Sequence, residues 1–355
     1  MSTAASPDMK RTVAWLHVLR SAKLIDYIGL TLVGLVGIWL LVNFVKDPVN
    51  FINVSFIGLT NGSIYGVVAL GYTLVYGILQ LINFAHGDVF ALSGLVASTV
   101  LFSVLGLSGD SSTPAIVGGI LVCLLITMPL FALVNAGIER VAYKPLRRAP
   151  RLAPLITAVG MSFIVQNVAL ALYGVEPESA SYLIPRSAVF TIGGVEFKWN
   201  QLTALLIVVP VLIVLTWFVR STRQGKAMRA VSQDTDASAM MGIDVNRTIS
   251  VTFIIAGGLA AAAGLVFLLE YNMRYDTGFQ LGLIAFTAAV LGGIGNLPGA
   301  VLGALLIGYT QAFNEGLTWH AAGSDWTRSI VFGILILTLV FRPEGLLGER
   351  TPEGA

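Results

Sequence analysis

The stretch 80–105 reads QLINFAHGDVFALSGLVASTVLFSVL, a long apolar run with a polar interruption near its start. Residues 84–105 are long enough to cross the hydrocarbon core of a bilayer as one helix, which takes about 20 residues. His86 and Asp88 are the only acidic or basic side chains within 51–109. The stretch therefore predicts a transmembrane helix that follows a polar break in the chain.

The composition extends this prediction to the whole chain. Hydrophobic residues make up 56% of the sequence, charged residues make up 11%, and the mean hydropathy is +0.83. Soluble domains average about 25% charged residues. We therefore expect an all-α polytopic membrane protein with about ten transmembrane helices. The apolar segments lie at about 24–45, 53–80, 84–105, 114–138, 152–174, 201–219, 248–270, 279–295, 298–316 and 328–341.

The number of complete crossings stays open between eight and ten, because the first segment or the pair within 279–316 need not cross fully. Breaks or re-entrant turns are expected near 81–88 and 292–299. If all ten segments cross, the loops on one side carry 16 Lys and Arg residues and those on the other side carry 5. The positive-inside rule assigns the richer side, with both termini, to the cytoplasm.

This topology divides the chain into four parts. Residues 1–23 form a cytoplasmic segment, and 24–45 form an N-terminal transmembrane helix that is too long for a signal-peptide core. Residues 46–347 form the main transmembrane domain, and 348–355 form a cytoplasmic tail.

Two loops of the main domain carry further signals. The outer loop 174–200 contains AVFTIGGVEFKW, which predicts a β-hairpin around two adjacent glycines. The inner loop 220–247 predicts one short helix from about Arg229 to Met241, with Gly242 just past its end.

Small residues recur at a spacing of four, which places a flat stripe on one helix face and lets a neighbouring backbone approach. A weak internal similarity relates NFAHGDVFALSG to GNLPGAVLGALLIG, as in transporters built from repeats with broken helices. The spaced sets are Gly58, Gly62 and Gly66; Ala256, Ala260 and Gly264; and Gly299 and Gly303.

The polar break itself has two compatible interpretations. Asn83 and Asp88 could cap the helix that follows, with the acidic group near the positive end of the helix dipole. Alternatively the break borders a substrate path, where free backbone groups and Asn83 meet a polar solute.

Several function classes find little support in the sequence. Its three histidines fall in separate regions, and no GxSxG motif occurs. Gly225-Lys226 lacks the remainder of a phosphate-binding loop, so the chain is not expected to hydrolyse ATP. No basic run suggests nucleic-acid binding, and the lone Cys123 excludes an intramolecular disulfide. Asp88 is the only clear acidic residue at membrane depth, which is little for ion coupling.

Four stretches carry a family resemblance that covers about residues 53–347. They are GYTLVYGILQLINFAHGDVFALSG, ERVAYKPLRRAPRLAPLITAVGMSFIVQN, RQGKAMRAVSQDTDASAMMGIDVNRTISVTFIIAGGLAAAAG and AFTAAVLGGIGNLPGAVLGALLIG. The chain resembles LivH-type permeases, the membrane subunits of branched-chain amino-acid ABC importers. Segment 24–45 is an addition relative to the short members of that family.

The resemblance implies a non-enzymatic permease subunit in a bacterial cytoplasmic membrane, working by alternating access. Its implied partners are a second, LivM-like permease, two cytoplasmic ABC ATPases that hold ATP and magnesium, and an extracytoplasmic solute-binding protein. No cofactor is expected in this chain. The ATPase-coupling role is carried over to Asp234, Asp236, Met240, Met241 and Gly242.

Three points stay open. The solute could be urea or a short amide, an ion-coupled secondary transporter is a more distant alternative, and the permease pair could be mixed or identical. The outer loop 174–200 is a candidate contact for the binding protein. Polar groups near intramembrane breaks are candidate substrate-path residues, although hydrogen bonding between helices would place them equally well. These candidates are Asn61, Tyr65, Asn83, His86, Asp88, Gln166 and Asn167.

Overall fold

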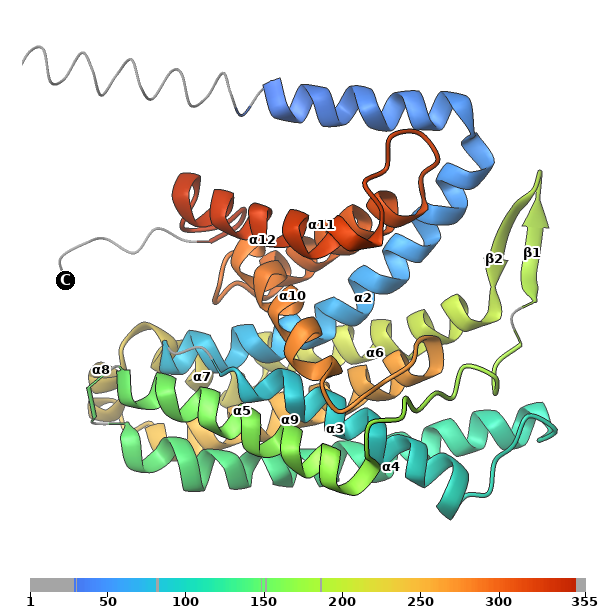
Figure 1. The fold of residues 1–355 in the computed structure, drawn as a ribbon. Coiled ribbons are helices and arrows are strands. Elements are labelled where there is room, and N and C mark those ends of the chain that lie inside the picture. The colour runs from blue at the N-terminus through green and yellow to red at the C-terminus, as the bar shows by residue number, and fades with distance from the viewer. Residues whose placement is uncertain are drawn as a thin grey trace, which may run out of the picture.

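The computed structural model describes residues 29, 31–80, 83–147, 149–150, 152–185 and 187–348, and helices dominate this part of the chain (Figure 1). The helices are α2 (Pro48–Leu79), α3 (Ala85–Thr99), α4 (Thr113–Ile138), α5 (Leu152–Tyr173), α6 (Trp199–Ser221), α7 (Arg223–Gln233), α8 (Thr235–Met240), α9 (Val245–Glu270), α10 (Thr277–Gly292), α11 (Leu297–Gly316) and α12 (Ser324–Phe341). Helical turns of other pitch extend α3 to Val104 and α4 to Leu146.

Among the described residues, seven helices are long and apolar enough to cross a membrane, so the chain is a multi-pass, largely helical protein. They are α2, α3 and α4 with their extensions, α5, α6, α9 and α12. Thr31–Lys46 and Thr277–Gly292 are shorter apolar helices. The prediction of about ten complete crossings is therefore not confirmed. Two of the ten segments give helices of only 10–17 residues, and a third, α11, is not among the seven.

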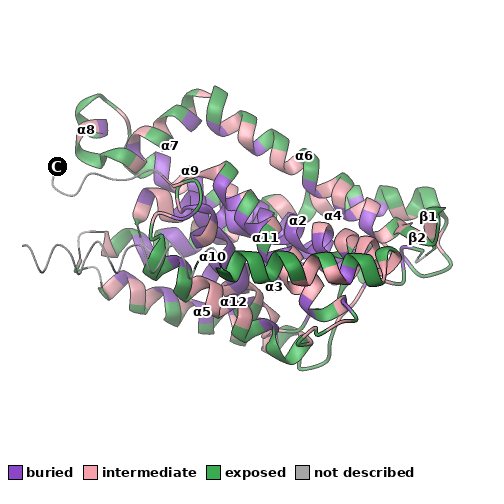
Figure 2. Ribbon diagram, turned by 90° about the horizontal axis from the view of Figure 1, so that it is seen from above, coloured by how far each residue is buried: buried purple, intermediate pink, exposed green. Residues whose placement is uncertain are grey.

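Burial separates an inner layer of helices from an outer one. In the most apolar window of α2 and of α9, 83% of residues are buried, whereas the figure is 22% for α4, α5 and α6. Figure 2 shows the buried residues gathered on the inner helices and the exposed ones along the sides of α6. Exposed apolar faces of this kind are suited to lipid.

The inner helices pack through small residues, as the sequence spacing predicted. A Cβ atom added at Gly62 would lie 2.7 Å from the Leu305 Cα of α11, and one at Gly308 would lie 2.2 Å from the Gly62 nitrogen. A Cβ at Gly264 of α9 would lie 2.4 Å from the Ser93 Oγ of α3. Backbones at such separations leave no room for a larger side chain.

The break before α3 corrects one sequence interpretation. The chain leaves α2 at Gln80, which has φ 52°, and α3 begins at Ala85 after the N-cap residue Phe84, without a side-chain cap. Asn83 instead accepts a hydrogen bond from the Tyr143 hydroxyl at 2.6 Å. Asp88 lies in the first turn but accepts from the Ser162 hydroxyl of α5. The predicted capping hydrogen bonds of Asn83 and Asp88 are therefore wrong, because both side chains bond to residues distant in the sequence. The predicted place of Asp88 in the first turn, at the positive end of the helix dipole, is confirmed.

The second predicted break lies between α10 and α11. Asn296 caps α11 by accepting a hydrogen bond from the Gly299 nitrogen at 3.0 Å. The chain after α12 returns to this turn, since the Leu346 and Leu347 nitrogens donate to the carbonyls of Leu291 and Gly292.

The predicted N-terminal transmembrane segment contains the helix Thr31–Lys46, which contacts the loop before α12. Trp39 Nε1 donates to the Trp319 carbonyl at 3.0 Å, and the Asn43 side chain exchanges two hydrogen bonds with the Trp319 backbone. The predicted segment 1–23 and nearly all of the tail 348–355 lie outside the described residues.

The predicted hairpin is present as β1 (Ala188–Ile192) and β2 (Val195–Lys198), which pair antiparallel on either side of Gly193 and Gly194. α6 starts directly after β2 and leads to α7, and its 23 residues span roughly 35 Å at 1.5 Å per residue. Figure 1 accordingly shows a hairpin end and an α7–α8 end on opposite sides of the bundle.

Candidate functional site

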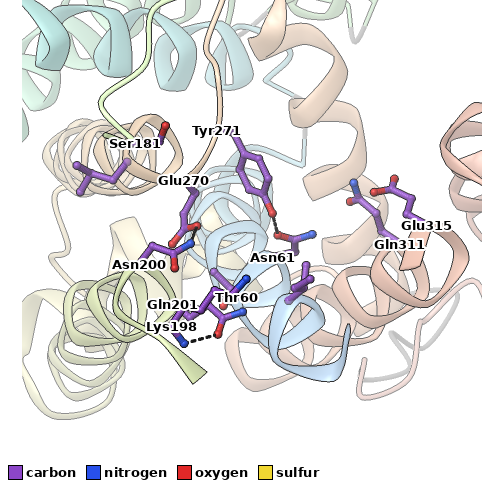
Figure 3. A pocket seen from close by; sticks show the side chains of 12 residues that line it. Thr60, Asn61, Ser181, Lys198, Asn200, Gln201, Glu270, Tyr271, Gln311 and Glu315 are labelled. Atoms are coloured by element: carbon purple, nitrogen blue, oxygen red, sulfur yellow. Dashed lines mark hydrogen bonds between the residues drawn. The ribbon is translucent and has the colours of Figure 1, made fainter. Parts of the chain in front are cut away.

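A cavity of about 370 Å³ lies at the hairpin end of the bundle (Figure 3). Ile57, Thr60 and Asn61 of α2 line one side of it, and the spacing of three and four residues puts them on one helix face. Gln311 and Glu315 of α11 line it with the same spacing.

The remaining lining residues come from chain segments that start or end a helix. α9 ends at the cavity with Leu269 and Glu270, and Tyr271 follows directly. Lys198 ends β2, and Asn200 and Gln201 form the first turn of α6. Ser181 of the loop before the hairpin completes the lining. Residues from four separate regions of the sequence therefore converge on this cavity, namely 57–61, 181–201, 269–271 and 311–315.

Hydrogen bonds fix several of these side chains. The Tyr271 hydroxyl donates to the Asn61 Oδ1, and Figure 3 shows the two side chains pointing toward each other. Asn200 Nδ2 donates to Glu270 Oε2 at 2.6 Å. The Thr327 hydroxyl donates to Glu315 Oε1 at 2.8 Å.

Charge is unevenly distributed around the cavity. Of its described lining residues, Glu270 and Glu315 are acidic and Lys198 is basic. Burial first, and then the negative charges of Glu270 and Glu315, raises the pKa of the Tyr271 hydroxyl, while the hydrogen bond to Asn61 lowers it. Tyr271 is therefore neutral at physiological pH and serves as a hydrogen-bond donor.

The structure places two of the seven candidate path residues at this cavity. Asn61 lines it, and the Tyr65 hydroxyl donates to the lining residue Gln311 at 2.6 Å. Both tyrosine–amide pairs link α2 to an element far away in the sequence.

Three other candidates lie together deeper in the bundle, around the start of α3. Asn83, His86 and Asp88 are each at most 2% exposed. The His86 ring packs edge-on against the Tyr72 ring at 4.9 Å between centroids. A Cβ atom at Gly71 would collide with the same imidazole, which shows how closely α2 approaches it. The structure therefore keeps these polar groups inside the protein, away from lipid.

Gln166 and Asn167 are separate from both groups. Gln166 is half-buried, and Asn167 is exposed on α5, where its amide donates to the Phe163 carbonyl at 2.8 Å. The candidate path residues thus lie in three separate places of the bundle.

Sequence reasoning missed most of the cavity lining. Glu270 and Glu315 stand at the ends of their helices, where acidic residues are ordinary, and a single sequence does not reveal that these ends meet. The spacing of Gln311 and Glu315, four apart on one apolar helix, was the one signal available.

The segment 220–247 differs from the predicted single helix. α7 spans Arg223–Gln233 and α8 spans Thr235–Met240, so the chain breaks at Asp234. Asp234 has an extended backbone, and its side chain accepts hydrogen bonds from the Asp236 and Ala237 nitrogens. An aspartate at this position starts a new helix rather than continuing the old one.

The segment nevertheless presents the candidate coupling residues on the surface. The exposed fractions of Met240 and Met241 are 82% and 83%. Asp236 is exposed in the first turn of α8, and Gly242 follows with φ 82°, a left-handed conformation that favours glycine. Met228 and Val231 of α7 are buried, so α7 is fixed to the bundle while the tip of α8 is open.

In the part of the chain that the structure describes, no group of three or more His, Cys, Asp or Glu side chains could hold a metal ion. The single cysteine, Cys123, is buried as a free thiol.

The chain is similar to known permeases over most of its length. A family model described as the permease component of branched-chain amino acid transport systems matches residues 54–340. BraD of Pseudomonas aeruginosa, a high-affinity branched-chain amino acid transport system permease protein, is 39% identical over 300 residues, covering 83% of this chain and 95% of BraD. The LivH proteins of Salmonella typhimurium and Escherichia coli, which carry the same description, are each 34% identical over 309 residues, covering 85% of this chain and 97% of LivH.

Proposed function

The chain belongs to the permease family of branched-chain amino acid ABC transport systems, and we propose that it is the membrane subunit of an ATP-driven importer for branched-chain or related amino acids. A permease for urea or a short amide is the alternative within the same family. The chain supplies the path and performs no chemistry, and ATP is hydrolysed with magnesium in partner ATPases.

One structural observation carries this proposal. α6 and α9 each run from the cavity at the hairpin end to the α7–α8 segment at the other end. α7 also packs against α2, α6 and α9, so a push on α7 and α8 reaches the helices that form the cavity. Helices connected in this way can rock between two arrangements that open to opposite sides, which is alternating access.

The orientation follows from charge. The α7–α8 segment and the loop after α4 carry many of the Lys and Arg residues, which favours the cytoplasmic side for this end. The hairpin end then faces outward, where the loop 174–200 can contact a solute-binding protein. In bacteria the membrane would be the cytoplasmic (inner) membrane.

Two kinds of partner would complete the transporter. A pair of ABC ATPases would bind α8 through Met240, Met241 and Asp236, because exposed methionines adapt their shape to a partner surface. A second, LivM-like permease would cover part of the remaining exposed surface. The exposed face of α5 supports such a cover, because Asn167 lies there among apolar side chains, and an exposed amide at membrane depth is unfavourable in lipid.

The ATPase contact can be tested by replacing Met241 with Glu. The chain would be co-expressed with ATPases, second permease and binding protein, and the tagged complex purified. We expect Met241→Glu to reduce both the retained ATPase and the uptake into proteoliposomes by about tenfold or more, since it places a charge in an apolar contact.

Ile192→Glu at the hairpin is the matched control, because Ile192 is also exposed, at 71%, and receives the same change at the opposite end. It should retain the ATPases. Equal retention by both variants would contradict the assignment of α8. Uptake by the wild-type complex that needs an ion gradient and ignores ATP would refute the importer altogether.

A further inference from the structure

Most of the side chains that line the cavity at the hairpin end are polar or charged. Ile57 and Leu269 are the apolar side chains among its described lining residues, and all the others are polar or charged. Its volume of about 370 Å³ falls within the range of small-molecule sites, about 300–1,000 Å³. Apolar burial contributes in proportion to area, and two aliphatic side chains offer a branched substrate side chain only a small area to pack against.

The charged residues that line the cavity suit a ligand that carries both a positive and a negative charge. Glu270 and Glu315 come from the ends of α9 and α11, and both line the cavity. Lys198, the last residue of β2, adds a basic side chain to the lining. Asn61 and Gln311 add amide groups that can donate or accept hydrogen bonds.

We propose that this cavity is a transit site that binds the α-ammonium and α-carboxylate groups of an amino acid and does not distinguish its side chain. Glu270 and Glu315 attract the ammonium, and Lys198 attracts the carboxylate. The proposal rests on the proposed function, of which it specifies the ligand class at one site. Selection among side chains is then left to the solute-binding protein.

A labelling experiment on the assembled transporter tests ligand binding at the cavity directly. Ser181 lines the cavity and is half-buried, so Ser181→Cys introduces a thiol of nearly the same size there. The native Cys123 is replaced by Ser to give a cysteine-free background. The rate of labelling by a small charged thiol reagent is then measured with increasing ligand.

Three groups of probes separate the parts of the proposal. Leucine, valine and alanine should protect the thiol with affinities within about threefold of one another. A difference of about 1.4 kcal/mol in binding free energy would change the affinity tenfold, so the expected differences between side chains are smaller than that. Isoamylamine, which lacks the carboxylate, and 4-methylpentanoate, which lacks the ammonium, should protect at least about tenfold less well. Protection by leucine alone, or equal protection by isoamylamine, would overturn the proposal.

Ser179→Cys is the matched control for position. Ser179 is also half-buried and bonds to Ser181 at 3.1 Å, but it does not line the cavity. Its labelling should not depend on amino acids. Equal protection at both positions would point to a general conformational change and would count against a site at the cavity.

Charge is tested in the Ser181→Cys background with Glu315→Gln, which keeps an oxygen for the hydrogen bond from Thr327. Protection by leucine should weaken about tenfold or more. Asp110→Asn likewise replaces a carboxylate with an amide, but at an exposed residue between α3 and α4, and it should leave protection by leucine unchanged.

Failure of this inference is distinguishable from failure of the proposed function. If wild-type proteoliposomes take up leucine with ATP while no amino acid protects Ser181→Cys, the transit site is wrong and the importer stands. If the wild type takes up no amino acid with ATP, the proposed function itself fails.

Discussion

Gly87 shows how a single residue sets the distance between two helices. It lies in the first turn of α3, where α3 crosses α10. A Cβ atom at Gly87 would lie 2.4 Å from the Gly278 carbonyl oxygen and 2.9 Å from the Gly282 Cα. Both contacts are with backbone atoms, which a side-chain rotation cannot relieve. The same turn carries His86 and Asp88, so the crossing also determines where these polar groups lie.

Gly87→Ala should therefore destabilise the protein. Overpacking a close contact costs about 1–3 kcal/mol, and the expected result is a lower midpoint of thermal unfolding in detergent.

Gly137→Ala in α4 is the control, because a Cβ atom there would meet nothing within 4 Å. A surface change of that kind should alter the free energy of unfolding by no more than about 0.5 kcal/mol. Equal midpoints for the two variants would mean that α3 and α10 are not this close.

At the scale of the element, Asp234 separates α7 from α8. Its side chain accepts hydrogen bonds from two backbone nitrogens of α8, at 2.9 Å from Asp236 and at 2.8 Å from Ala237. α8 has six residues and one buried residue, Ser238, so packing alone holds it weakly. The cap therefore contributes a large share of its local stability.

Asp234→Ala should loosen α8 without unfolding the bundle. Loss of an N-cap costs about 1 kcal/mol, so amide hydrogen exchange within residues 236–240 should accelerate about fivefold. The measurement is hydrogen exchange followed by mass spectrometry on the intact permease.

Asp236→Ala is the matched control, since Asp236 lies in the first turn of the same helix and the cap comes from Asp234. Its exchange should change less. Faster exchange in the Asp236 variant than in the Asp234 variant would contradict the cap assignment.

At the scale of the whole molecule, the two ends of the bundle differ in chemistry. One end has a polar cavity beside a β-hairpin, and the other has a basic, methionine-tipped segment. Helices of the inner layer, α2 and α9, join them and are largely buried. An importer needs such a polarity, because substrate arrives at one side and energy at the other.

The orientation of this polarity can be measured with Ile192→Cys and Met241→Cys, both at exposed positions, in the Cys123→Ser background. In intact cells, a membrane-impermeant thiol reagent that crosses any outer membrane should label Ile192→Cys. Met241→Cys should be labelled only after the membrane is permeabilised, because loops rich in Lys and Arg stay in the cytoplasm. The reverse pattern would invert the proposed topology.

Local features of the structure could be predicted from the sequence, whereas contacts between residues far apart in the chain could not. The apolar runs, the hairpin around Gly193 and Gly194, and the small-residue stripe at Gly58 and Gly62 depend on residues close together in the chain. Asn83 illustrates the limit. Its sequence position suits a helix cap, but its side chain accepts a hydrogen bond from Tyr143, which is 60 residues away.

The sequence by itself determined that this chain is a multi-pass helical membrane protein of the branched-chain amino acid permease family, because hydrophobicity and family motifs are properties of residues in order. Only the tertiary structure decided that Asn61, Glu270, Tyr271 and Glu315 share one cavity. These residues come from three helix ends or faces that are far apart in the chain. These residues come together only because of the way the helices pack, and that packing is determined by side chains throughout the bundle.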